Sequence, residues 1–120
     1  MLVPLDRSAI LSLAQDLPRE EASLGGHGTV YVRSLTGKER DAFEQSCFLV
    51  AGNDRRSNLS NIRARLLVVA LCDENGARLF EDKDADALGD LPASILDPLF
   101  AMAQRLSGIS KGDVETLAGN

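Results

Sequence analysis

Apolar residues recur at intervals of three and four along much of this chain, which is the spacing of one face of an α-helix. Residues 6–16 show this spacing, and Pro18 ends the segment. The apolar face of this segment is formed by Ile10, Leu11 and Ala14. Over residues 20–34 the period changes to two, with Val30 and Val32 on one side and glycines before them. The pattern therefore predicts a short helix followed by a β-hairpin.

Helical spacing returns after the hairpin. Thr36 and Glu39 have the spacing of a capping box, in which each side chain hydrogen-bonds the backbone amide of the other residue. The apolar face that follows consists of Phe43, Cys47 and Val50. We therefore expect a helix that begins after Thr36 and is stopped by Gly52, and a polar loop over residues 53–58.

The segment 59–72 ends in seven consecutive apolar residues, 66–72. A segment that is apolar all round is buried on most sides. Its length and its amphipathic start favour a helix, while the β-branched Val68 and Val69 leave a buried strand as the competing interpretation. Residues 73–76, with the sequence Asp-Glu-Asn-Gly, predict a turn.

The last long apolar segment covers residues 91–108 and contains Pro98. Proline in a helix interior costs about 3 kcal/mol, because it removes a hydrogen bond and crowds the preceding turn. We therefore expect a break or kink, with Asp97 as a new N-cap and Pro98 as the first residue of a new helix. Residues 109–120 predict a short, frayed tail helix.

These elements together predict a mainly α fold with a small N-terminal β-hairpin, an α+β arrangement in a single compact helical domain over residues 1–120. The length of 120 residues is enough for one hydrophobic core. Phe43, Leu66 and Phe100 lie on the apolar faces of three different predicted helices. We expect them to meet in that core.

Charge and composition narrow the classes of function. The chain carries 18 acidic and 13 basic residues, a formal net charge of −5, which argues against nucleic-acid binding through a basic face. The N-terminus lacks the pattern of a signal peptide, and the longest apolar run is too short to span a bilayer. We expect a cytoplasmic protein without membrane association, in which Cys47 and Cys72 are buried thiols.

The acidic residues do not form a recognisable catalytic or metal site. Aligning Gly76 with the glycine of an EF-hand loop puts Leu71, which has no side-chain oxygen, at the first ligand position. Asp82 then falls at the last position, where the longer glutamate is usual. His27 is the single histidine, and it lies in a glycine-rich turn. We therefore predict no catalytic, metal or cofactor-binding residues, and no enzyme activity.

Three blocks of the sequence, residues 28–44, 61–92 and 99–110, resemble the tail assembly chaperones of long-tailed bacteriophages, in the short form found in siphophages of the lambda and HK97 type. The residues that match the family's first block are Arg33, Leu35, Thr36, Gly37, Glu39, Arg40, Asp41, Phe43 and Glu44. Those that match its second and third blocks are Arg63, Leu66, Leu71, Cys72, Asp73, Glu74, Gly76, Leu79, Phe80, Leu88 and Gly89. The order and spacing of the blocks carry the resemblance over residues 4–115.

The resemblance implies a non-catalytic protein of phage or prophage origin that acts in tail morphogenesis. Proteins of this family bind the tape-measure protein and keep it soluble until tail-tube proteins polymerise around it. They act in the cytoplasm of the bacterial host and are absent from the mature virion. The alternative is a small cytosolic adaptor or regulatory domain with an unknown partner. Self-association is left open in both cases.

A helical partner is bound by laying an apolar stripe into a groove, so the contact residues should be apolar and incompletely packed. The residues that follow a turn or a proline meet this condition best in a small domain. The candidates for partner binding are Leu79, Phe80, Leu99 and Met102. The competing interpretation for each is an ordinary place in the core.

Overall fold

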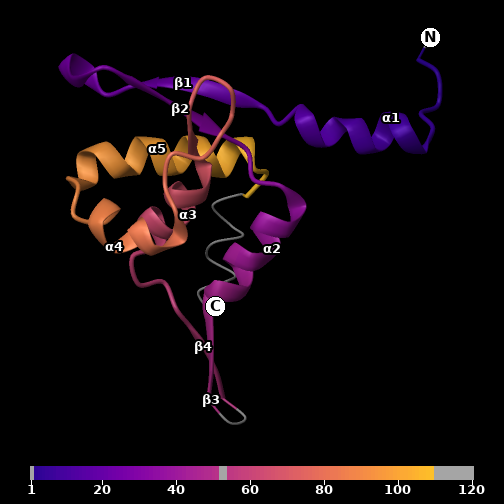
Figure 1. The fold of residues 1–120 in the computed structure, drawn as a ribbon. Helices are drawn as coiled ribbons and strands as arrows, with labels where there is room; N and C mark the ends of the chain where they lie inside the picture. Colours follow the sequence, from indigo (N-terminus) through magenta and orange to yellow (C-terminus); the bar gives the residue numbers. More distant parts are fainter. Residues whose placement is uncertain (1, 52–53, 110–120) are drawn as a thin grey trace.

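The computed structural model describes residues 2–51 and 54–109 (Figure 1). The helices are α1 (Arg7–Ser12), α2 (Gly37–Ser46), α3 (Ile62–Ala70), α4 (Ala85–Leu88) and α5 (Ala93–Leu106), with 3-10 turns η1 (Leu13–Gln15), η2 (Gly25–His27) and η3 (Asp82–Asp84). The strands are β1 (Arg19–Ser23), β2 (Thr29–Arg33), β3 (Phe48–Ala51), β4 (Asp54–Ser57) and β5 (Leu71–Cys72). Of the predicted tail helix over 109–120, residues 110–120 lie outside the described residues.

The predicted hairpin belongs to a larger sheet. β1 and β2 pair antiparallel from Arg19↔Arg33 to Ser23↔Thr29, and β5 pairs antiparallel with the other edge of β2. The order in this three-stranded sheet is β1-β2-β5, and β3 and β4 form a second, two-stranded sheet. The prediction of a mainly α fold whose β-structure is one small hairpin is therefore wrong: the described chain has two antiparallel sheets, one of three strands and one of two.

The apolar run at residues 66–72 contains both structures that the sequence left open. Its first part is the end of α3, and at Leu71 the backbone becomes extended (φ −72°, ψ 128°) and enters β5. The residues on both sides of this change are buried, Ala70 in the helix and Cys72 in the strand. A segment that is buried on all sides has no polar face, so its pattern cannot show where the helix ends.

The second correction concerns residues 47–58. α2 ends at Ser46, with Cys47 as its C-cap, instead of continuing to the glycine at position 52. Phe48–Ala51 is β3, and part of the predicted polar loop is β4. Aromatic and β-branched residues favour strands, and here the next strand is available as a partner within the same chain. Helical spacing of the apolar residues was therefore misleading at this point.

The third correction concerns Pro98, which does not break the last helix: α5 is continuous from Ala93 to Leu106 (Figure 1). The hydrogen bond that Pro98 cannot donate would go to the carbonyl of Ser94. Both residues are exposed, so water can hydrate that carbonyl. The helix keeps its direction because its opposite side is held in the core by Leu96, Leu99 and Ala103.

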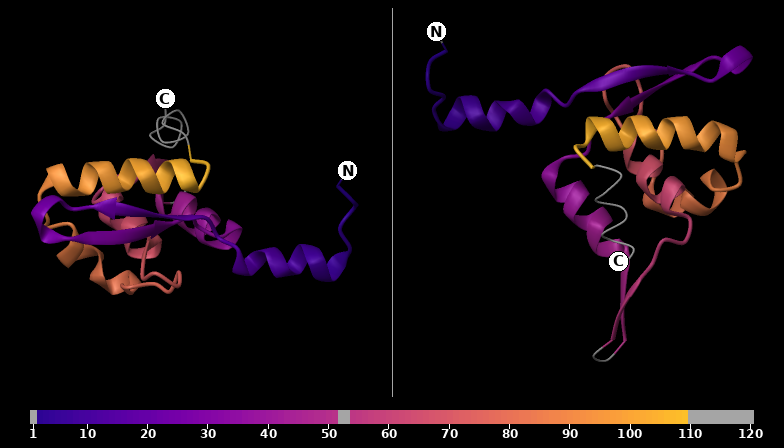
Figure 2. Two further views of the ribbon diagram at one scale, coloured as in Figure 1. Left: turned by 90° about the horizontal axis from the view of Figure 1, so that it is seen from above. Right: turned by 180° about the vertical axis from the view of Figure 1, so that it is seen from behind.

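The core lies between α3, α5 and the three-stranded sheet. α5 packs against both α3 and β2, and Figure 2 shows it running alongside the hairpin. Leu66 is fully buried and Phe43 is 5% exposed, as expected, whereas Phe100 is half-buried at the edge of the core. Val32, Leu67 and Ala103 are other fully buried members of this core.

Two segments project from this body. α1 continues away from the end of β1, and the β3–β4 hairpin extends in another direction (Figures 1 and 2). The radius of gyration of the Cα atoms is 16.0 Å, whereas a compact chain of this length has a value of about 14 Å. The projection of α1 leaves its residues without a covering core in the described chain.

Candidate protein-interaction surfaces

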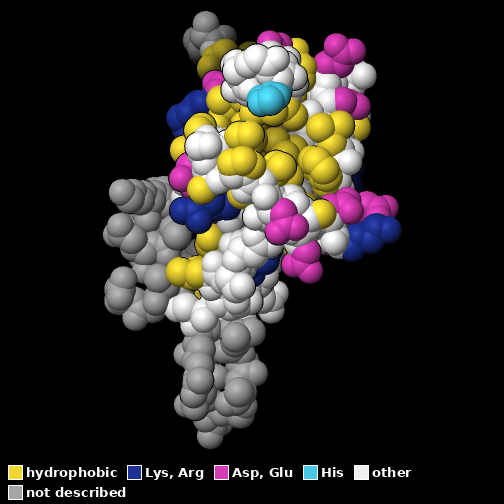
Figure 3. All heavy atoms as spheres, turned by 90° about the vertical axis from the view of Figure 1, so that its left-hand side faces the viewer, with side chains coloured by type: hydrophobic (Ala, Val, Ile, Leu, Met, Phe, Trp, Pro, Cys, Tyr) yellow, Lys and Arg dark blue, Asp and Glu magenta, His cyan; other side chains and the backbone are white. Residues whose placement is uncertain are grey.

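A hollow with an apolar floor lies between the tip of the β1–β2 hairpin and α5, and we call it the α5 groove. Its volume is about 400 Å³. Ten residues line it: Glu21, Ala22, Ser23, Leu24, Gly25, Ser94, Ile95, Pro98, Leu99 and Met102. Figure 3 shows apolar side chains gathered on this face, below the hairpin tip that carries the single histidine.

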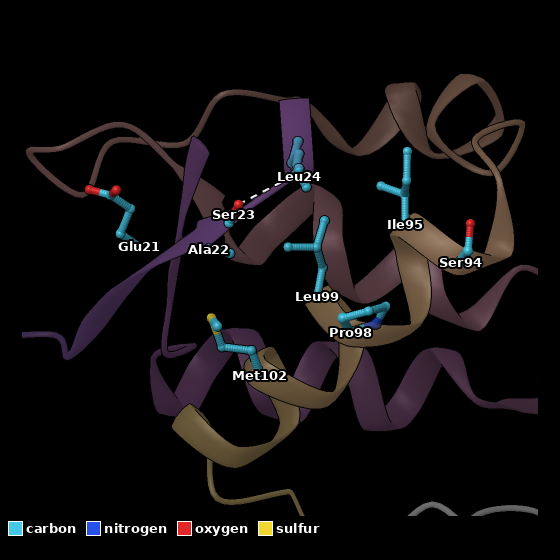
Figure 4. Close-up of a pocket in the computed structure, with 10 residues that line it drawn as sticks. Glu21, Ala22, Ser23, Leu24, Ser94, Ile95, Pro98, Leu99 and Met102 are labelled. Atoms are coloured by element: carbon cyan, nitrogen blue, oxygen red, sulfur yellow. Dashed lines mark hydrogen bonds between the residues drawn. The ribbon is translucent and has the colours of Figure 1, made fainter. Parts of the chain in front are cut away.

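One side of the α5 helix forms the floor of the α5 groove. Ile95, Leu99 and Met102 are spaced by four and three residues, so they lie along the same side of α5 and face the hairpin (Figure 4). The opposite wall comes from Ala22 in β1 and Leu24 just after it. Ala22 and Leu99 are almost fully buried, at 6% and 3% exposed, so they seal the bottom of the groove.

The hairpin tip that forms this wall is held by its own hydrogen bonds. The amide of Leu24 donates to the carbonyl of Gly28 (2.7 Å), and the amide of Gly25 donates to the Ser23 hydroxyl (3.2 Å). Gly25 and Gly28 have positive φ values of 66° and 119°, which side chains with a Cβ rarely adopt. The glycines therefore build the tight turn that places Leu24 over α5.

The predicted contact residues are only partly brought together. Leu99 and Met102 both line the α5 groove, Leu99 as a core residue and Met102 half-buried. Leu79 and Phe80 do not line it. Leu79 is 50% exposed, and Phe80 is half-buried against the core.

A second hollow of about 360 Å³ lies beside α2 and α3. The two arginines that line it already make hydrogen bonds within the chain. Arg65 donates to the Ser46 carbonyl (2.9 Å), and Arg78 donates to the Val68 carbonyl (2.9 Å) and to the Asp82 carboxylate (2.8 Å). These bonds connect secondary-structure elements, so the polar side chains of this hollow hold the fold together.

The N-terminal segment, residues 2–15, is an apolar surface that the sequence pattern did not identify as a binding site. We call it the arm. Its large apolar residues are 53–97% exposed: Leu2, Val3, Leu5, Ile10, Leu11 and Leu13. The α1 helix is capped by the Asp6 carboxylate, which accepts from the Ala9 amide (2.9 Å), and none of its residues is buried. Helical spacing predicted the apolar face but could not show that no core covers it.

Several of the residues that carry the family resemblance hold the secondary-structure elements together. The Arg33 guanidinium makes two hydrogen bonds of 2.9 Å to the Glu39 carboxylate and so joins β2 to α2. Glu39 also completes the predicted capping box with Thr36. Burial alone would raise the pKa of Glu39, but the hydrogen bonds from Arg33 and Thr36 outweigh it and hold the pKa below its ordinary value of 4.5.

The acidic turn that follows β5 also has a structural explanation. The Asp73 carboxylate accepts hydrogen bonds from the amides of Asn75 (2.8 Å) and Ala77 (3.0 Å), and Gly76 has a φ of 87°. Downstream, a Cβ at Gly89 would collide with the side chain of Asn61, which itself donates to the Ala85 carbonyl (2.9 Å). Gly76 therefore suits the backbone of the turn, and a larger residue at Gly89 would displace the Asn61 side chain.

The described residues contain no group of three or more His, Cys, Asp or Glu side chains that could hold a metal ion. Cys47 and Cys72 are buried free cysteines, and burial raises the pKa of both thiols. In the same part of the chain, no helix is both long enough and apolar enough to cross a membrane.

No family model and no curated protein matches this sequence. A solved structure does. The fold is similar to that of the bacteriophage HK97 tail assembly chaperone. The two structures superpose with a TM-score of 0.58, covering 81% of this chain and 95% of the HK97 chain, at 15% sequence identity. At this level of identity the likeness establishes a common fold.

Proposed function

We propose that this protein is a non-catalytic phage tail assembly chaperone, which binds the tape-measure protein and helps to recruit tail-tube subunits during tail morphogenesis. The observation that carries the proposal is the similarity of its fold to the HK97 tail assembly chaperone over 81% of the chain. The sequence blocks described above point to the same family independently of the coordinates. On this proposal the protein works in the cytoplasm of the bacterial host and is absent from the finished virion.

The α5 groove supports the proposal because it fits a helical partner. An amphipathic helix binds by inserting apolar side chains at helical spacing into an apolar groove, and the floor of this groove presents Ile95, Leu99 and Met102 at that spacing. The net charge of −5 would keep a protein with such exposed apolar surface dispersed. We assign the tape-measure protein to this groove.

Co-expression tests the proposal. The cognate tape-measure protein should become soluble when both are expressed together, and it should co-purify with a tagged copy of this chain. A tape-measure protein that stays wholly insoluble, with no complex recovered, would contradict the proposal. Mass spectrometry of purified particles should find no peptides of this protein.

Two neighbouring residues of α5 provide a matched pair of variants. Met102→Asp places a charge in the groove, whereas Ala101→Asp places the same charge on an exposed position of the same helix. We expect Met102→Asp to lose tape-measure binding while its melting temperature stays close to that of Ala101→Asp. Leu79→Asp tests the exposed candidate outside the groove in the same assay.

A further inference from the structure

Pro98 lowers the stability of the helix in which it stands. Proline is well accepted in the first turn of a helix, but Pro98 lies beyond the first turn of α5, which runs from Ala93 to Leu106. An ordinary residue with a backbone amide would stabilise the helix at this position. Pro98 also lines the α5 groove. A residue that is unfavourable for the fold and lies at a binding surface is expected to have a functional reason.

The effect of Pro98 on the groove is a free backbone carbonyl. In an α-helix the carbonyl of each residue points along the axis toward the amide four residues later, so the Ser94 carbonyl points toward position 98. Because proline has no N–H, this carbonyl has no helical donor. Ser94 and Pro98 are both exposed and both line the α5 groove, one turn apart on the same helix (Figure 4). The groove therefore has a hydrogen-bond acceptor beside its apolar floor.

Two other polar side chains that line the groove already make hydrogen bonds within the chain. The Ser23 hydroxyl accepts from the Gly25 amide (3.2 Å), and the Glu21 carboxylate is hydrogen-bonded to the Tyr31 hydroxyl. The Ser94 carbonyl, in contrast, can be hydrated while the groove is open. When another segment covers the groove, that hydration is lost. The carbonyl then needs a new donor, because a buried acceptor without one is costly.

We propose that the Ser94 carbonyl, left free by Pro98, determines the specificity of the α5 groove by accepting a hydrogen bond from a side chain of the bound segment. This contact rests on the proposed function and defines the chemistry of the tape-measure segment that binds there. The segment carries apolar side chains at helical spacing, which pack on Ile95, Leu99 and Met102. Beside them it carries one side chain with an N–H donor, which is a lysine, arginine, asparagine or glutamine.

The donor must come from a side chain, because the backbone amides of a bound helix are already used within that helix. A purely apolar helix would cover the Ser94 carbonyl without giving it a donor, so it would bind more weakly. The free carbonyl thus selects among amphipathic helices that fit the floor of the groove equally well.

Replacing Pro98 should have opposite effects on stability and on binding. Pro98→Ala restores the amide, so the Ser94 carbonyl is bonded within α5 and the donor of the partner is left without its acceptor. The melting temperature should rise, while the affinity for the partner should fall by about 3–10-fold, the effect of one hydrogen bond. A residue with only a structural role would not give a more stable fold and a weaker complex together.

Titration calorimetry of the full chain with helical peptides of the cognate tape-measure protein measures this change. Pro98→Val also restores the amide but keeps an apolar side chain of similar size, so it should weaken binding as much as Pro98→Ala. Ser94→Ala favours the helix without supplying an amide at position 98, so it should bind like wild type. Weaker binding by Pro98→Ala but not by Pro98→Val would indicate a lost apolar contact and overturn the proposal.

A double-mutant cycle identifies the donor. In a peptide that binds, each lysine, arginine, asparagine and glutamine is replaced in turn by methionine. One replacement should weaken binding to the wild-type chain by about 3–10-fold and have little effect on binding to Pro98→Ala. Equal affinity of the wild type and both Pro98 variants, or no replacement with this dependence, would overturn the proposed contact and leave the chaperone function standing. A wild-type chain that binds neither the peptides nor the co-expressed tape-measure protein would contradict both.

Discussion

Removing the ion pair between Arg33 and Glu39 should lower the stability of the fold. The pair joins β2 to α2, and the side chains are 6% and 24% exposed. Replacing Glu39 by Ala leaves a nearly buried guanidinium whose remaining hydrogen bond among the described residues goes to the Ser34 carbonyl (2.9 Å). It also removes the hydrogen bond that the Thr36 amide donates to Glu39 (2.9 Å).

Removing one partner of a buried pair costs about 3–5 kcal/mol, because the remaining charge is left uncompensated. Glu39 is partly exposed, so water can compensate some of that charge, and we expect the lower end of the range. Loss of half of the capping box adds to the cost on the order of 0.5–1 kcal/mol. The expected loss in the free energy of unfolding for Glu39→Ala is therefore about 3–4 kcal/mol.

Urea denaturation followed by circular dichroism measures this loss. Glu44→Ala is the matched control, because it makes the same substitution on the same helix at a pair with Arg40 that is about one-third exposed. Exposed pairs of this kind contribute about 0.5 kcal/mol or less. A Glu39→Ala loss no larger than that of Glu44→Ala would refute the reasoning.

The pH dependence of the same variant gives an independent check. The pKa of Glu39 is lowered in the folded state, so its stabilising effect is complete above the ordinary pKa of 4.5. The effect disappears as the pH falls through the folded-state pKa. The difference in stability between wild type and Glu39→Ala should be constant from pH 7 to about 5 and shrink below 4.5. A difference that grows on acidification would contradict this assignment.

Three further predictions concern the core, the last helix and the acidic turn. Leu66→Ala and Phe43→Ala should each lower the free energy of unfolding by about 2–5 kcal/mol in urea denaturation. Phe100→Ala should lower it by less, because Phe100 is half-buried. Losses below about 1 kcal/mol for all three variants would be inconsistent with this core. Pro98→Ala should stabilise α5 by about 1–3 kcal/mol, because a backbone donor is restored within a continuous helix, and a lower melting temperature would count against it. Calorimetry should detect no micromolar calcium binding at residues 73–76, where backbone amides already occupy the carboxylate.

Local chemistry predicted the elements whose signals lie within a few residues. The capping box at Thr36 and the glycine turn at Gly76 are both present, and so is the N-terminal hairpin. Each is set by hydrogen bonds or backbone angles within one short segment. The strands β3 and β4 were missed, and β5 was left as an alternative to helix, because strands form by pairing with other segments, which apolar spacing does not encode.

The candidate contact residues were also predictable only as far as local spacing reaches. Spacing placed Leu99 and Met102 on one side of the last helix, and the structure adds that this side faces the hairpin tip. The opposite wall, formed by Ala22 and Leu24, comes from a segment about 70 residues earlier, so no local pattern could assign it. The exposure of Leu11 depends on the absence of a neighbour, which also lies beyond local sequence.

The central claim is that the α5 groove binds the tape-measure protein in tail assembly. The most direct measurement is co-purification of that protein with three forms of this chain: wild type, Met102→Asp and Ala101→Asp. The account predicts that wild type and Ala101→Asp retain a soluble complex and that Met102→Asp, although folded, retains none. Equal recovery of the complex with all three forms, or with none, would contradict it.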